Sequence, residues 1–365
     1  MTSFTTLELL TPTGPVSRRV SLAPPRKPTE SEMPIIDLTT IDDGENARKV
    51  LAEKMKLAAE NTGFFYVSNH GIPEKLIQSA LEQVKGFFNQ SPADKDRVGF
   101  ARSGKSCGYH SVGSTQINNT ETRDKKETFS MRYDTRIDPF HAGKTHEDVN
   151  STFAATDFVW NGTSHLPNFR PVLTEFYQER LKLARKIIRL FALALGLPED
   201  YFDSIVTQPG ADAVHIHYPG TDEMPRNGQD VDVGIGSHTD IQCVTLLWQD
   251  MSGGLQVLSA ADEWLDAQPI EGTLVINIGD FLQRLSNNKF KSTVHRVYNR
   301  QKTSRYAMPF FLGFNPDHIC EVVPTCVDAD HPPLYEPISC GKWREVRLKL
   351  AETGKVASQD KNSLL

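Results

Sequence analysis

Apolar residues recur at helical spacing in three segments before residue 200, namely 44–62, 73–87 and 173–195. Because side chains three and four positions apart share one face of a helix, each segment predicts an amphipathic helix. Gly196 and Pro198 end the longest of them. We expect this helix to lie against a sheet through Leu173, Phe176, Tyr177, Leu181, Ala184, Ile187, Ile188, Phe191 and Leu195.

Short runs of β-branched and aromatic residues indicate strands, at 34–38 and 63–67 among the helices and then repeatedly after residue 212. The later runs are separated by Gly, Asn and Asp, and they cover 213–218, 242–248, 255–258, 273–278, 293–298 and 305–314. Regularly spaced short strands of this kind are typical of an antiparallel sandwich or barrel. The pattern therefore predicts an α+β fold with a mainly β core and N-terminal helices packed on one face.

Three segments lack this periodicity. Residues 1–32 are rich in Thr, Pro and Ser and predict a flexible leader, which could instead drape over the core. Residues 98–165 predict long loops, where substrate contacts are often found. We assign residues 33–345 to one domain, comprising an N-terminal α/β part (33–100), the loop-rich region, a backing helix (168–196) and the β core (212–320). Residues 341–365 predict a C-terminal helix and tail that could close one end.

Composition excludes several classes of protein. Of the 365 residues, 38% are hydrophobic and 24% charged, which is typical of a soluble globular protein. The net charge of -6 offers no broad cationic surface, so we expect no nucleic-acid partner. No stretch approaches the ~20 apolar residues that span a bilayer, so we expect no membrane partner. The five cysteines form no CxxC pair, which predicts reduced thiols and a cytoplasmic enzyme.

His238 and Asp240 form a candidate metal site, because side chains at i and i+2 of a strand point to the same face. His295 follows after 54 intervening residues, inside another strand-like run. Two imidazoles and one carboxylate on one side of a metal make a facial triad with open positions, typical of non-haem Fe(II) oxygenases. Zinc accepts the same donors, and a His-x-Asp pair taken alone also fits a surface loop.

Motifs across residues 33–345 decide between these alternatives. The chain resembles the isopenicillin N synthase-like group of 2-oxoglutarate- and Fe(II)-dependent dioxygenases, and the matching pieces follow the order of that family. They are residues 34–37 (PIID), 63–71 (GFFYVSNHG), 124–129 (DKKETF), 217–219 (HYP), 237–240 (SHTD), 253–257 (GGLQV), 277–280 (NIGD) and 292–297 (STVHRV).

The resemblance implies a double-stranded β-helix (jelly-roll) barrel, with Fe(II) on His238, Asp240 and His295. It also implies that Arg305, ten residues beyond His295, binds the far carboxylate of 2-oxoglutarate and that Tyr218 can reach the same group. The family has Ser where this chain has Ala307. Losing one neutral donor costs on the order of 1 kcal/mol, so we expect weakened, not abolished, cosubstrate binding.

The implied reaction consumes O2 and oxidatively decarboxylates 2-oxoglutarate to succinate. It couples this to hydroxylation, desaturation or cyclisation of a small-molecule metabolite, as in the oxidative tailoring of secondary metabolites. Two alternatives stay open at this point, an Fe(II) oxidase that does not consume 2-oxoglutarate and a catalytically silent ligand-binding protein on the same fold. By position in the family pattern, Tyr109, Phe129, Phe311 and Phe314 are candidate substrate contacts.

Overall fold

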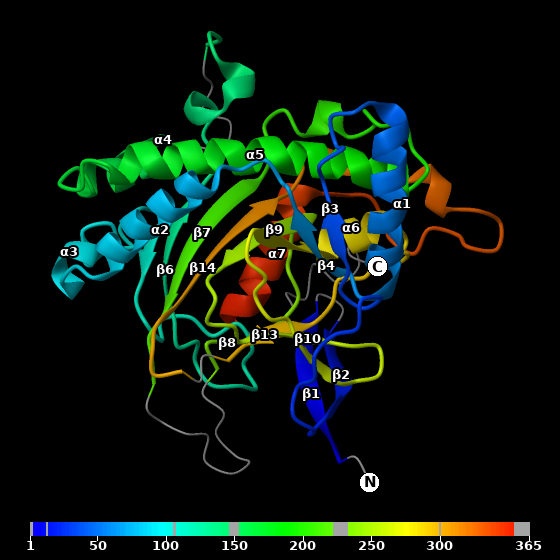
Figure 1. Cartoon of the computed structure of the whole chain (residues 1–365), viewed down its shortest axis with the longest axis horizontal. Helices are drawn as coiled ribbons and strands as arrows, with labels where there is room; N and C mark the ends of the chain where they lie inside the picture. Colours follow the sequence, from blue (N-terminus) through cyan, green and yellow to red (C-terminus); the bar gives the residue numbers. More distant parts are fainter. Residues whose placement is uncertain are drawn as a thin grey trace.

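Two main β-sheets and a layer of helices form the body of the computed structural model (Figure 1), which describes residues 3–11, 14–104, 107–145, 153–221, 233–298 and 301–353. The large sheet has eight strands in the order β3-β4-β12-β9-β14-β7-β6-β5, all antiparallel except the β3–β4 pair. Its strands are β3 (Ile35–Asp37), β4 (Phe64–Ser68), β5 (Gly108–His110), β6 (Glu127–Met131), β7 (Ala211–Tyr218), β9 (Val244–Gln249), β12 (Thr273–Ile278) and β14 (Arg305–Leu312).

The small sheet has four strands, in the order β11-β10-β13-β8. They are β8 (Ile235–His238), β10 (Leu255–Leu258), β11 (Trp264–Asp266) and β13 (His295–Val297). Its inner side chains, such as Val257, pack with Ile216 and Ala307 of the large sheet in one buried cluster. The two sheets therefore face each other across an apolar interior.

Helices cover the outer face of the large sheet. The longest, α5 (Phe169–Ala194), runs across it in Figure 1, and α1 (Glu45–Asn61) and α2 (Glu74–Phe88) pack against α5. The Tyr177 hydroxyl of α5 donates to the Ala211 carbonyl of β7 at 2.9 Å. This arrangement confirms the predicted mainly β core with N-terminal helices on one face.

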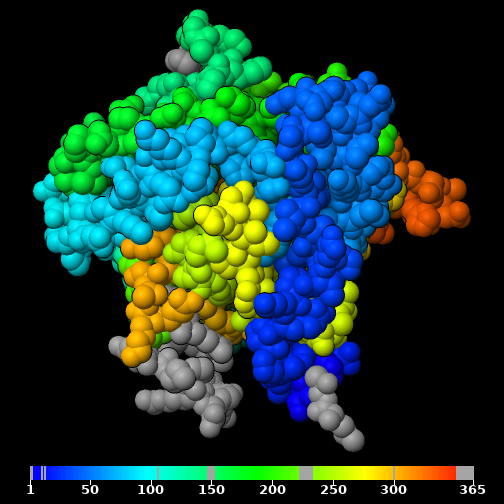
Figure 2. Space-filling view, in the orientation of Figure 1, coloured from blue at the N-terminus to red at the C-terminus, as the bar shows by residue number. Residues whose placement is uncertain are grey.

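The N-terminal residues form a hairpin of β1 (Phe4–Thr11) and β2 (Gly14–Ser21), in which Leu9 pairs with Val16. Leu7, Leu9 and Val20 pack on the small sheet beside Trp264. Figure 2 shows this dark-blue segment lying against the yellow part of the chain. The alternative of a leader draped over the core therefore holds for residues 4–11 and 14–21. One face of the hairpin supplies the apolar side chains that make this contact.

Residues 98–165 contain more packed structure than their polar composition predicts. Strands β5 and β6 extend the large sheet, and α4 (Phe153–Gly162) buries Val159 and Trp160 in the main core. Strands of three to five residues carry too little periodicity to stand out from loops. The region is loop-rich, but it also contains these packed elements, which the sequence reasoning did not expect.

The remaining elements are short or lie at the C-terminus. The C-terminal helix α7 (Cys340–Thr353) contacts β1, and the predicted tail after Thr353 lies outside the described residues. Within the described ranges no helix combines the length and apolarity of a membrane span. The short elements are α3 (Pro92–Asp96), η1 (Thr135–Ile137), η2 (Pro139–His141), η3 (Asp203–Ile205), α6 (Asp280–Leu285), β15 (Ile319–Cys320), η4 (Pro324–Cys326) and β16 (Ile338–Ser339).

Candidate metal centre

The three predicted ligands meet at one end of the small sheet. His238 ends β8, His295 begins β13, and the two residues are directly paired across the strands. Asp240 follows in the loop after β8, and its Oδ1 lies 3.7 Å from the Nε2 atoms of both histidines. One ligand atom from each residue lies within 4.8 Å of the others. The predicted triad is therefore a compact group of three metal-binding side chains.

The far side of each ligand is held by the protein, which orients its free atoms toward the centre. His238 Nδ1 lies 2.7 Å from the Gly236 carbonyl and His295 Nδ1 lies 3.1 Å from the Thr293 carbonyl, so each Nδ1–H donates to backbone and each Nε2 is left for a metal. Asp240 Oδ2 accepts hydrogen bonds from Thr245 and from Asn277 Nδ2, the latter at 2.7 Å, which leaves Oδ1 facing the imidazoles.

Burial and nearby charges give His238 and Asp240 the protonation states that a metal requires. Burial, and then the nearby His295, lower the pKa of His238 to about 4, so its imidazole is neutral near pH 7. Burial alone would raise the pKa of Asp240, but His295, His238 and the hydrogen bonds from Asn277 and Thr245 outweigh that effect and lower it. His238 thus offers a neutral nitrogen donor and Asp240 an anionic oxygen donor, and a set of two imidazoles and one carboxylate fits Fe(II).

Arg305 lies in the interior between the sheets, and its side chain is buried. Its Nε donates to the Gly253 carbonyl at 2.6 Å and its Nη2 to Gln249 Oε1 at 2.9 Å, whereas Nη1 has no hydrogen-bond partner among the described residues. Tyr218 is its direct cross-strand neighbour, and the guanidinium carbon lies 4.9 Å from the Tyr218 ring centre. A buried N–H without an acceptor is costly, so this corner of the interior is suited to an anionic group such as the far carboxylate of 2-oxoglutarate.

Ala307 stands on the same interior face as Arg305, between Ile216 of β7 and Gln249 of β9. It supplies no hydroxyl at the position where the family has one. Among the described residues, the side chain that accepts a hydrogen bond from Arg305 is the Gln249 amide. The Nε2 of Gln249 in turn donates to the Ala267 carbonyl at 3.2 Å, which fixes the amide.

The four candidate substrate contacts fall in different places. Phe311 lies on the interior face, directly across from Asp212 and from Thr245, and Thr245 itself bonds Asp240. Tyr109 and Phe129 are corrections, because both face the helix layer: Tyr109 donates to Glu127 and Phe129 packs on Phe87 and Phe169. Phe314 is also a correction, since it is fully buried between Phe202 and Phe281. For Tyr109, Phe129 and Phe311 the alternation of side chains along the strand, which no motif records, decides the outcome.

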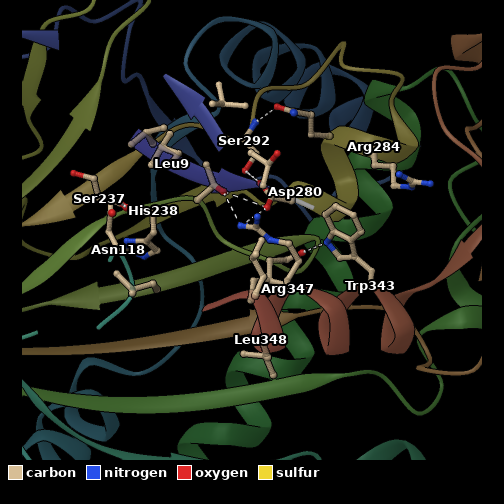
Figure 3. A pocket seen from close by; sticks show the side chains of 18 of the residues that line it. Leu9, Asn118, Ser237, His238, Asp280, Arg284, Ser292, Trp343, Arg347 and Leu348 are labelled. Carbon is tan, nitrogen blue, oxygen red and sulfur yellow. Dashed lines mark hydrogen bonds and ion pairs between the residues drawn. The ribbon is translucent and has the colours of Figure 1, made fainter. Parts of the chain in front are cut away.

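Sequence reasoning missed the contribution of α7 to the metal-binding loop, which is residues 238–241 at the end of β8. Arg347 forms an ion pair with Asp280 at 2.9 Å and donates to the Thr239 hydroxyl at 3.2 Å, between two of the ligands. Trp343 Nε1 donates to the Ile241 carbonyl at 3.0 Å. Figure 3 shows Arg347 directed at Asp280 with Trp343 beside it. The i, i+4 spacing of Trp343 and Arg347 on a basic helix is the one signal in the sequence that points to this contact.

Comparison with known proteins agrees with this geometry. Residues 33–154 match the family described as non-haem dioxygenase in morphine synthesis N-terminal, and residues 211–314 match the 2OG-Fe(II) oxygenase superfamily. The 2-oxoglutarate-Fe(II) type oxidoreductase ppzC of Metarhizium rileyi is 39% identical, with 94% of each chain covered. The oxidoreductase hxnY of Emericella nidulans, of the same type, is 32% identical, covering 84% of this chain and 86% of its own.

Among solved structures, a full-length Neurospora crassa protein crystallised in complex with alpha-KG superposes with a TM-score of 0.74 at 26% identity, covering 91% of this chain and 100% of that chain. The two family matches span more than half of the sequence, and the described triad stands where their chemistry requires it. The chain therefore belongs to the 2-oxoglutarate-Fe(II) oxygenase superfamily and is a dioxygenase that uses Fe(II), 2-oxoglutarate and O2.

Proposed function

We propose that this enzyme couples the oxidative decarboxylation of 2-oxoglutarate to hydroxylation, or a related C–H oxidation such as desaturation or cyclisation, of a small-molecule metabolite. In hydroxylation, one atom of O2 enters succinate and the other enters the product. The observation that carries the proposal is the buried Nη1 of Arg305, which has no partner among the described residues and faces the same interior as the triad. Bound Fe(II) supplies the activation of O2.

The chain's own residues bind 2-oxoglutarate, orient the metal ligands and shield the site from water. Arg305 holds the far carboxylate of 2-oxoglutarate through charge-assisted hydrogen bonds. Burial raises the pKa of Tyr218 to about 12, so its hydroxyl stays protonated and is able to donate to the same carboxylate. Thr245 and Asn277 keep Asp240 in position, while the apolar cluster between the sheets excludes water.

Relatives support a small organic substrate. The same full-length Neurospora crassa protein has also been crystallised with alpha-KG and thymine, and another relative, at 28% identity, is the 1-aminocyclopropane-1-carboxylate oxidase of Dictyostelium discoideum. In our proposal the two facing sheets are the halves of the jelly-roll expected from the sequence. We also place the enzyme in the cytoplasm, a reducing compartment that suits five buried cysteines without disulfides.

Anaerobic spectroscopy and product analysis together test the proposal. Addition of Fe(II) and 2-oxoglutarate to the purified protein should produce a weak visible charge-transfer band. Admission of O2 should then yield succinate, faster in the presence of a metabolite extract. In the extract, comparison of metabolites before and after reaction should reveal a mass change of one oxygen or of two hydrogens.

Each failure of this experiment has a distinct meaning. A metallated protein that forms no band with 2-oxoglutarate would contradict the assignment of Arg305. A band without succinate under any extract fraction would favour a catalytically silent binding protein. Succinate without any altered metabolite would remove the small-molecule substrate from the proposal.

A further inference from the structure

A cavity of about 420 Å³ adjoins the metal centre, and among the described residues its lining includes the N-terminal hairpin, the metal-binding loop and the C-terminal helix α7. The hairpin contributes Leu9 and Arg18, α7 contributes Trp343 and Arg347, and the metal-binding loop contributes His238 and Thr239. Figure 3 shows Leu9 and His238 on one side and Arg347 on the other. The volume lies within the roughly 300–1,000 Å³ of small-molecule sites.

Two walls of this cavity, the hairpin and α7, lie outside the segments that match the family, whereas most of its other lining residues lie inside them. Those segments cover residues 33–154 and 211–314, whereas the hairpin ends at Ser21 and α7 begins at Cys340. The metal and cosubstrate residues lie inside the matched segments. The matched segments carry the chemistry that the family shares. Walls built from segments outside the match are where we expect selectivity among substrates.

Most of the surface that lines the cavity is apolar, but its positively charged side chains outnumber its negatively charged ones. Three arginines and one carboxylate, that of Asp280, face the cavity among the described residues. Two of the arginines are engaged, Arg347 with Asp280 and Arg284 with the Glu336 carbonyl. The apolar lining residues are Leu9, Val16, Ile117, Ile241, Val294, Trp343, Leu348 and Leu350.

Arg18 is the third arginine, and it differs from its neighbour Arg19. Arg18 pairs across the hairpin with Leu7, so it shares the face that packs toward the core, and no ion pair or hydrogen bond of its guanidinium occurs among the described residues. Arg19 points to the other face and binds Asp262 at 2.9 Å. Within the described part of the chain, the cavity therefore combines a mostly apolar lining surface with the exposed Arg18 at its rim, whose guanidinium has neither an ion pair nor a hydrogen bond.

We propose that this cavity binds the substrate, and that the substrate is a small monocarboxylic acid with an apolar body. The proposal rests on the proposed function. The body occupies the cavity between the hairpin and α7, and the carboxylate pairs with Arg18, whose planar fork matches two carboxylate oxygens. The occupant also contacts Arg347, which is bonded to Thr239 in the metal-binding loop. The substrate thereby lies beside the metal-binding loop without being a ligand of the metal.

Calorimetric titration of the Fe(II)-loaded enzyme under argon, with saturating 2-oxoglutarate, tests this assignment. The probes are phenylacetate, indole-3-acetate, cyclohexanecarboxylate and octanoate, each compared with its primary amide. Saturating 2-oxoglutarate keeps the probes from Arg305. We expect at least one acid to bind roughly five- to tenfold more tightly than its amide, since an exposed guanidinium contributes less than a buried one.

Arg18→Gln should reduce the affinity for that acid to the level of the amide, and Arg19→Gln is the matched control on the opposite face. Leu9→Trp, which fills the cavity, should abolish binding of both probes while the charge-transfer band persists. Equal binding of acids and amides, or equal loss in both arginine variants, overturns the proposal. A normal band with no binding by any probe also overturns it and leaves the proposed function standing, whereas absence of the band removes both.

Discussion

Paired strands of the two sheets form the interior that holds the metal ligands, whereas the N-terminal hairpin and the C-terminal helix α7 form two walls of the neighbouring cavity. In the interior, His295 and His238 are paired across adjacent strands, and every ligand has a fixed partner on its far side. At the cavity, the walls are a hairpin and a helix that reach the centre through single contacts such as Arg347 with Thr239. Strand ladders fix reactive groups tightly, while terminal elements can vary in shape without disturbing them.

This contrast predicts that loss of an interior ligand has the largest effect. His238→Ala removes one of three donors from a buried site, so Fe(II) affinity should fall by well over the roughly 10- to 100-fold typical of outer-shell changes. The charge-transfer band and succinate formation should disappear with it. Metal titration followed by spectroscopy measures both. His331→Ala, which alters an exposed histidine paired with Asp328, should change neither; retention of full metal binding by His238→Ala would show that the triad is not the metal site.

Arg305→Gln should have the next largest effect, confined to the cosubstrate. Loss of two charge-assisted hydrogen bonds is worth roughly 3 kcal/mol, or about a hundredfold in the KM for 2-oxoglutarate. Fe(II) affinity should stay unchanged, because Arg305 contacts Gly253 and Gln249 but none of the ligands. Steady-state kinetics with varied 2-oxoglutarate gives the first value and metal titration the second. A parallel fall in both would mean that the substitution disrupts the interior as a whole.

Arg347→Met tests the contact between α7, which lines the cavity, and the metal-binding loop. It keeps much of the side-chain length but removes the ion pair to Asp280 and the hydrogen bond to Thr239. We expect Fe(II) affinity to fall by about tenfold, the lower end of the range for outer-shell partners. Lys342→Ala on the same helix, at a half-exposed position, is the control. If Arg347→Met lowers the melting temperature but leaves the Fe(II) Kd unchanged, α7 is a structural cover and does not position the loop.

Sequence reasoning succeeded where periodicity or a motif is strong. The long helix α5, the strands β12 and β14 and the triad all follow from local pattern or ordered motifs. It failed where the outcome depends on which face of a strand is buried: Tyr109 and Phe129 lie on β5 and β6, and only their register with β7 places them on the helix side. It did not predict the strand pairing of the hairpin or the contacts of Arg347, because the partners of both on the core lie far away in the chain and no local pattern records such contacts.

The smallest expected effect concerns Ala307, which stands where the family has a Ser beside the cosubstrate. Ala307→Ser places a hydroxyl on the interior face beside Arg305, between Ile216 and Gln249. If that hydroxyl reaches the cosubstrate, it adds about 1 kcal/mol, or roughly fivefold tighter binding of 2-oxoglutarate. In the free enzyme the same group is buried in an apolar cluster, so the free energy of unfolding should fall slightly.

Ala213→Ser is the matched control for this last effect, because Ala213 is equally buried but belongs to the cluster on the helix side of the large sheet. It should lower the free energy of unfolding without changing the affinity for 2-oxoglutarate. Calorimetric binding and denaturant unfolding separate the two quantities. Unchanged affinity in Ala307→Ser would mean that the amide of Gln249 already fixes Arg305 so well that the missing hydroxyl has no role in this chain.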